Sequence, residues 1–147
     1  MALTVSKSNS VETVNWSELE TILLDMDGTL LDLQFDNRFW GETVPKKWGE
    51  MHCLDLRTSQ QRLAPIFAAQ QGTLNWYCLD YWTDKLGFDI ASMKQTFADN
   101  VSWRPQSETF LAQLNASYLD VVLITNAHPK TLKIKNEQLN LEKWFDR

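Results

Sequence analysis

The sequence has few of the features that mark secreted proteins, membrane-spanning proteins or proteins held together by structural zinc sites. It contains only two cysteines, Cys53 and Cys78, and neither lies in a C-x-x-C pair. This argues against a disulfide scaffold or a zinc site, so we expect two reduced, partly buried thiols. No apolar run approaches the roughly 20 residues that a membrane-spanning helix needs, and residues 1–20 lack the apolar stretch of a signal peptide. We therefore expect a cytoplasmic protein without membrane contact.

Positive charge is also scarce. The chain has 14 Lys and Arg against 19 Asp and Glu, which gives a formal net charge of -5. Because no basic run is long enough to follow a nucleic-acid backbone, we expect no nucleic-acid partner. An acidic protein can still bind a small phosphate ester when a metal cation offsets the repulsion between carboxylates and phosphate.

Two short apolar runs, residues 21–24 and 121–124, predict buried parallel strands, and each ends at a polar cluster. Helical apolar spacing covers 36–51, 58–86, 89–101, 106–117 and 129–139, with Pro65, Gly72 and Gly87 interrupting or punctuating these segments. Alternating strands and helices predict an α/β fold with a parallel sheet. Ligands of such sheets bind beyond the carboxyl ends of the strands, so both polar clusters should face one crevice.

The first polar cluster is Asp25-Met26-Asp27-Gly28-Thr29. Two carboxylates this close repel each other, and a divalent cation such as Mg²⁺ relieves the repulsion. The chemistry that fits is phosphoryl transfer: Asp25 attacks phosphorus to form an aspartyl-phosphate, and Asp27 serves as general acid and then general base. Gly28 permits the tight turn that brings backbone N–H groups toward the phosphate.

Other readings of this cluster compete. An EF-hand loop needs glycine at its sixth position, but Gly28 is the fourth residue and Leu30 the sixth, so this reading is excluded. An ordinary Asp-Gly turn and a helix N-cap both remain open from the residues alone.

Residues 23–32 resemble the first motif of the haloacid dehalogenase superfamily, D-x-D-G-T, and residues 122–126 resemble its second motif. The resemblance implies a Rossmann-like parallel sheet core, incomplete here, with an inserted α-helical cap. The expected divisions are a polar tail over 1–19, a partial core over 20–31 and 106–147, and a cap over 32–105. The second acid of the pair, Asp27, favours a phosphatase or phosphomutase within this superfamily.

The same resemblance assigns roles around the crevice. Mg²⁺ would be held by Asp25 and Asp27, and the phosphate would be bound by Met26, Asp27 and Gly28. The Thr125 hydroxyl would bind the phosphoryl oxygens, although it could instead only cap the helix that follows.

Two neighbours of Thr125 are less specific. Asn126 would order the loop or touch the ligand. His128 is interpreted as either a substrate contact or a solvated loop residue.

Two stretches, 35–40 and 73–82, resemble bacterial GMP/IMP nucleotidases of this superfamily. This implies a purine nucleoside 5′-monophosphate as substrate, with Arg38 or Asn75 reading polar base edges and an aromatic residue such as Trp76 stacking on the base. The competing interpretation is that Trp76, Leu79 and Trp82 share one helix face and pack in a core. Another small phosphate ester, a sugar phosphate or phosphoglycolate, is the alternative substrate.

The superfamily also uses a later lysine and a later acid, and both follow the second strand by tens of residues. Lys130, Lys133 and Lys135 fall too early for that lysine, and the sequence ends at Arg147. We therefore expect a truncated product or a remainder supplied by another chain, with an inactive fragment as the alternative to an enzyme. The strand at 21–24 would then have an open edge that could support self-association.

Overall fold

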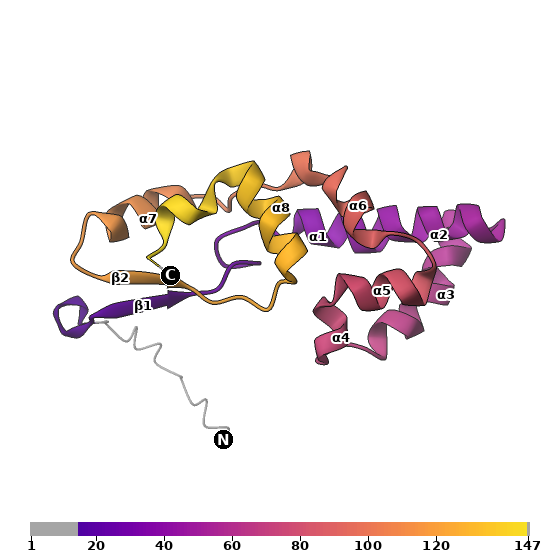
Figure 1. The fold of residues 1–147 in the computed structure, drawn as a ribbon, viewed down its shortest axis with the longest axis horizontal. Helices are drawn as coiled ribbons and strands as arrows, with labels where there is room; N and C mark the ends of the chain where they lie inside the picture. Colours follow the sequence, from indigo (N-terminus) through magenta and orange to yellow (C-terminus); the bar gives the residue numbers. More distant parts are fainter. Residues whose placement is uncertain (1–14, 147) are drawn as a thin grey trace, which may run out of the picture.

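The computed structural model describes residues 15–146 (Figure 1). Most of the polar tail expected over residues 1–19 lies outside the described residues. The part inside them includes one 3-10 turn, η1 (Trp16–Glu18). Among residues 15–146, no helix has the length and apolar character needed to cross a membrane.

Two parallel strands form the sheet within the described part of the chain. Strand β1 (Thr21–Leu24) pairs with β2 (Asp120–Leu123), with Thr21 opposite Asp120 and Leu24 opposite Leu123. The first strand has the predicted bounds, and the second begins and ends one residue earlier than predicted. The predicted mixed α/β class with a parallel sheet is confirmed.

The remaining elements are helical. In chain order they are α1 (Gln34–Arg38), the π-helical turn η2 (Phe39–Thr43), α2 (Val44–His52), α3 (Leu56–Ala68), α4 (Leu74–Tyr77), α5 (Leu79–Leu86), α6 (Ile90–Gln95), the 3-10 turn η3 (Ala98–Asn100), α7 (Ser107–Asn115), α8 (Pro129–Leu139) and the 3-10 turn η4 (Leu141–Trp144). Figure 1 shows α2 to α5 at one end of the molecule and the two strands at the other, with α8 between them.

The helical stretch predicted over 58–86 is divided among α3, α4 and α5. Gly72 lies between α3 and α4, and Gly87, with a φ of 82°, ends α5 in the left-handed region. Pro65, in contrast, lies inside α3 and does not end it. Aspartates at the helix starts explain two of the boundaries, since Asp55 and Asp89 accept backbone N–H groups of the first turns of α3 and α6.

Buried apolar side chains gather in three clusters. One lies among the helices away from the sheet, and its buried members are Phe39, Val44, Leu63, Leu79, Trp82, Leu86 and Ile90. The other two surround the sheet and α8, with Met26, Leu31, Phe35 and Ile134 in one and Leu30, Leu111 and Val121 in the other. The turn between β1 and α1 therefore has buried residues in two of these clusters.

The segments that lead into and out of the helical insertion pair with each other. The Asp32 N–H donates to the Ser102 carbonyl at 2.9 Å, and the Arg104 N–H donates to the Leu30 carbonyl at 2.8 Å. Leu31 and Trp103 form an antiparallel bridge between these two bonds. The chain thus leaves the sheet region and returns to it at one place.

Two surface features bear on the sequence expectations. Both cysteines are free, but Cys53 is exposed, so the expectation of two partly buried thiols holds only for Cys78. Leu23 in β1 is 61% exposed, and among the described residues β1 has a partner strand on one side only. Self-association through this edge stays a prediction.

Gly49 should tolerate no side chain, because an added Cβ would lie 2.4 Å from the Ser59 hydroxyl oxygen and 2.9 Å from the Leu54 carbonyl oxygen. We expect Gly49→Ala to lower the free energy of unfolding by about 1–3 kcal/mol, the usual range for overpacking. The matched control is Gly41→Ala, since a Cβ there meets nothing within 4 Å. This control should be neutral or stabilising by up to about 1 kcal/mol, because alanine favours helical backbone. Urea unfolding followed by circular dichroism measures both, and equal effects would contradict the predicted packing.

Candidate active site

The turn after β1 holds the predicted acid pair in two different environments. The Asp25 side chain is exposed and accepts a hydrogen bond from the Thr29 hydroxyl at 3.3 Å. Met26 is fully buried, and its carbonyl accepts the N–H groups of Leu30 and Leu31 at 2.9 Å. The apolar Met26 side chain therefore anchors the turn and leaves Asp25 facing solvent.

Gly28 has a φ of +79°, a region that L-residues other than glycine rarely adopt. Its N–H donates to the Leu31 carbonyl at 2.9 Å, which closes the turn. Its own carbonyl accepts a hydrogen bond from the Arg104 guanidinium, a contact that the sequence analysis missed. Arg104 therefore links the segment that returns from the helical insertion to the site turn.

The two polar clusters that follow the strands do meet. A hollow of about 290 Å³ is lined by Asp25, Thr125 and Asn126, together with the apolar residues Leu23, Leu24 and Ile124. The Thr125 hydroxyl oxygen accepts the Ala127 N–H at 3.0 Å, so it also orders the loop it belongs to. The predicted crevice beyond the strand ends thus joins Asp25 to both predicted polar partners from the second motif.

His128 contacts the start of α8 and one residue of α5. Its Nδ1 accepts the Lys130 N–H at 3.3 Å and caps α8, while its Nε2 lies 3.7 Å from an Asp80 carboxylate oxygen of α5. The Lys130 ammonium reaches Asp80 at 2.5 Å. The loop after β2 and the start of α8 therefore contact the helical insertion through an exposed acid.

Asp27 is held by a lysine that the sequence analysis did not place at the site. The Lys135 ammonium of α8 lies 2.5 Å from Asp27 Oδ1 and 2.6 Å from Asp36 Oδ2, and Lys135 is only 1% exposed. A second buried lysine, Lys94 of α6, contacts Asp36 Oδ1 at 2.6 Å. Two carboxylates and two ammonium groups thus form one partly buried chain of ion pairs.

Burial and these ion pairs shift the pKa values of Asp27 and Asp36 in opposite directions. Burial raises the pKa of the Asp27 carboxyl above its usual range, although Lys135 works against that rise. Burial also acts to raise the pKa of Asp36, but Lys94 and Lys135 outweigh it, and the pKa of Asp36 is lowered. Asp27 is therefore the carboxyl that is easier to protonate, as a general acid requires.

The three residues predicted to read the substrate are not brought to this hollow. Arg38 donates to the Asn100 side chain at 3.3 Å and lies over the Phe97 ring, and Asn75 donates to Gln70 at 3.1 Å. None of the three, Trp76 included, is among the residues that line the hollow beside Asp25.

Trp76 has the surroundings of a packing residue. It is partly buried against the helical cluster, its ring meets that of Trp82 edge to face at a centroid distance of 6.5 Å, and its carbonyl accepts the Trp82 indole N–H. The helix that the sequence predicts across this stretch breaks at Cys78, which separates α4 from α5. The contacts nevertheless match the interpretation of an aromatic stripe that packs in a core.

The two predicted magnesium ligands, Asp25 and Asp27, offer different donor atoms. Among residues 15–146, no group of three or more acidic, histidine or cysteine side chains could hold a metal ion. Asp25 fits the role of ligand, since its carboxylate is exposed and offers the hard oxygen atoms that Mg²⁺ prefers. Asp27 fits less well through its side chain, because Lys135 occupies Oδ1.

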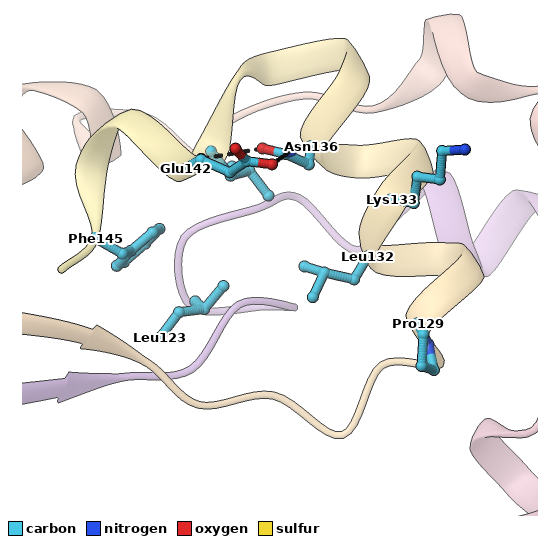
Figure 2. Close-up of a pocket in the computed structure, with 8 residues that line it drawn as sticks. Leu123, Pro129, Leu132, Lys133, Asn136, Glu142 and Phe145 are labelled. Carbon is cyan, nitrogen blue, oxygen red and sulfur yellow. Dashed lines mark hydrogen bonds between the residues drawn. The ribbon is translucent and has the colours of Figure 1, made fainter. Parts of the chain in front are cut away.

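A separate and more apolar hollow of about 400 Å³ lies between the end of β2 and α8 (Figure 2). Leu123, Leu132 and Phe145 point toward one another there, and Asn136 and Glu142 are joined by hydrogen bonds at its rim. It contains none of the predicted catalytic residues, so the candidate active site is the smaller hollow beside Asp25.

The sequence contained a weak signal for the missed lysine. Lys135 shares the buried face of α8 with Thr131 and Ile134, at the spacing i, i+3 and i+4. A lysine at a buried helix position needs an anionic partner, and the helix that follows the second strand is adjacent to the acid pair in a parallel α/β unit. No local pattern singles out Lys94 or Arg104.

Comparison with known proteins relates the chain to nucleotidases in sequence. No family model matches it. Over 133 residues it is 41% identical to the GMP/IMP nucleotidase YrfG of Escherichia coli (strain K12), and equally to that of Shigella flexneri. Each match covers 90% of this chain and 60% of the relative, so the chain spans about 60% of the length of these curated relatives.

Solved structures relate it to a fold. The crystal structure of a HAD phosphatase from Thermococcus onnurineus matches 87% of this chain and 60% of that chain, with a TM-score of 0.74 at 16% identity. A dehalogenase crystal structure matches 91% of this chain and 62% of that chain, with a TM-score of 0.50, also at 16% identity. The resemblance expected from the two motifs is confirmed: the chain has the haloacid dehalogenase-type fold and is a sequence relative of the GMP/IMP nucleotidases.

Proposed function

We propose that this chain carries the nucleophile and the general acid of a magnesium-dependent phosphomonoester hydrolase. The observation that carries the proposal is the hollow in which Asp25 meets Thr125 and Asn126 at the carboxyl ends of two paired strands. Ligands of open parallel sheets bind at this kind of place. The relatedness to GMP/IMP nucleotidases supports a phosphate ester as the ligand.

In the first step, an Asp25 carboxylate oxygen attacks phosphorus, and the bond from phosphorus to the ester oxygen breaks. The Asp27 carboxyl gives its proton to that leaving oxygen, a role that its raised pKa supports. In the second step, the Asp27 carboxylate takes a proton from water while the water oxygen attacks phosphorus. Inorganic phosphate leaves, and the Asp25 carboxylate is restored.

Other groups at the turn would stabilise the charge on the phosphoryl oxygens. The Thr125 hydroxyl can donate a hydrogen bond to them, and the backbone around Met26 and Gly28 can offer N–H groups. Mg²⁺ would be held by Asp25 and by Asp27, and when bound it would neutralise charge between carboxylate and phosphate.

We propose that the helical insertion acts as a lid over this hollow. We propose that residues 20–31 and 106–147 belong to the sheet domain and that 32–105 form a helical cap. The paired crossings near Leu31 and Trp103 and the separate apolar cluster among the helices support this division. A cap excludes water and shapes specificity. The proposal includes a cytoplasmic setting and a purine nucleoside 5′-monophosphate as substrate.

Removing the nucleophile should stop turnover. We expect Asp25→Asn to lower kcat on the order of 1,000-fold or more, because the amide cannot form the covalent intermediate. The control is Glu108→Gln, an exposed acid in the first turn of α7 that should leave kcat unchanged. Release of inorganic phosphate measures both variants. An Asp25→Asn variant with near wild-type activity would refute the assignment.

Removing the metal should have the same effect without a mutation. Hydrolysis in excess EDTA is expected to fall to background, and added MgCl₂ should restore it, because the exposed Asp25 carboxylate otherwise repels a dianionic ester. The circular dichroism spectrum is recorded in parallel to show that the chelator leaves the fold intact. Hydrolysis at an unchanged rate in EDTA would exclude the metal requirement.

The substrate class is tested with a panel of esters. We expect kcat/KM for GMP and IMP to exceed that for glucose 6-phosphate and phosphoglycolate by at least about tenfold, the scale of a few specific pocket contacts. Thymidine monophosphate serves as the control that separates purine recognition from nucleotide recognition. Faster hydrolysis of the sugar phosphate or of phosphoglycolate would favour the alternative substrates instead.

A further inference from the structure

Lys135 lies at a buried position, where a charged ammonium group is energetically unfavourable. Its side chain is 1% exposed, and transfer of an ammonium group out of water is unfavourable by several kcal/mol unless anions compensate. Two carboxylates do so, at 2.5 Å and 2.6 Å. A neutral apolar side chain of similar volume would fill the same space without that cost, so the charge itself calls for an explanation.

The second carboxylate fixes the lysine. Asp36 accepts Lys135 on Oδ2 and Lys94 on Oδ1, so both of its oxygen atoms are engaged. The Lys94 ammonium in turn lies 5.2 Å from the ring centroids of Phe35 and Phe39. These contacts join α1, α6 and α8, and they leave Asp36 and Lys135 little freedom to rotate.

Asp27 is held at one oxygen only. Lys135 contacts Oδ1, while the Asp27 side chain keeps 28% of its surface exposed. Lys135 therefore restrains the carboxyl group through one oxygen, Oδ1, while part of the side chain stays accessible.

We propose that Lys135 is a positioning residue for Asp27, with Asp36 and Lys94 as its fixed support. The inference rests on the proposed function, in which Asp27 delivers a proton to the leaving oxygen. Lys135 touches neither the ester nor the metal; it sets the orientation in which Asp27 Oδ2 meets the leaving oxygen. Positioning of this kind matters because a displacement of about 1 Å can cost on the order of 100-fold in rate.

The test separates positioning from a merely structural role through the leaving group. Lys135→Met keeps the volume and removes the charge. A nucleoside 5′-monophosphate has an alkoxide leaving group that needs a proton, whereas the leaving group of 2,4-dinitrophenyl phosphate departs as a stable anion. We expect kcat to fall on the order of 100-fold with GMP and less than about threefold with 2,4-dinitrophenyl phosphate, since only proton delivery is impaired.

Two further variants complete the experiment. Lys133→Met is the matched control, since Lys133 lies on the same helix with an exposed side chain and pairs only with Glu137 at 3.7 Å. It should leave both rates unchanged. Asp36→Asn weakens the support of Lys135. It should lower kcat with GMP by about tenfold, a tenth of the loss expected for Lys135→Met, and again leave hydrolysis of 2,4-dinitrophenyl phosphate nearly unchanged. This variant decides the question if Lys135→Met does not fold.

Equal losses on the two esters, or no loss on either, would overturn the proposal. A wild-type protein that hydrolyses neither ester would instead overturn the proposed function. In that case, thermal unfolding of Asp27→Asn, Lys135→Met and the double variant tests whether Lys135 holds Asp27. We expect the melting temperature of the double variant to fall by less than the sum of the two single shifts, because both changes break one contact. Additive shifts would show that Lys135 does not hold Asp27.

Discussion

The Ile124 N–H donates to the Leu24 carbonyl at 2.8 Å, one residue beyond the last paired position of the two strands. This backbone bond joins the two segments at the point where both strands end, directly beside the candidate site. Asp25 follows directly on one strand and Thr125 on the other. A shift of the register by one residue would turn the side chains of β1 to the opposite face and separate the two polar clusters.

The buried ion pairs depend on the same register. Met26 anchors the turn in the apolar cluster that also contains Ile134 of α8, so the packing of that helix determines which α8 residue reaches Asp27. Lys135, next to Ile134, is the residue that does so. The apolar contact and the ion pair therefore act together, because the first positions a helix and the second uses that position to restrain a carboxylate.

Local patterns were sufficient to predict the sheet and the turn. The strand at 21–24 and the helix at 129–139 have the bounds that their apolar spacing and flanking residues predict. Prediction was weaker where distant contacts decide the outcome. Lys135 and Asp27 are 108 positions apart, and nothing in the residues around either one reveals the other. The break at Cys78, whose Sγ caps α5 by accepting the Tyr81 N–H, and the position of Pro65 inside α3 were also not predicted.

The paired crossings at Leu31 and Trp103 have a geometric consequence. Because the chain departs and comes back at adjacent positions, the two ends of the helical insertion lie side by side. Its length can vary with little penalty, since the entropy of closing a loop grows only with the logarithm of loop length. The helical insertion can therefore change in sequence and size while the strand ends that carry Asp25 and Thr125 stay paired.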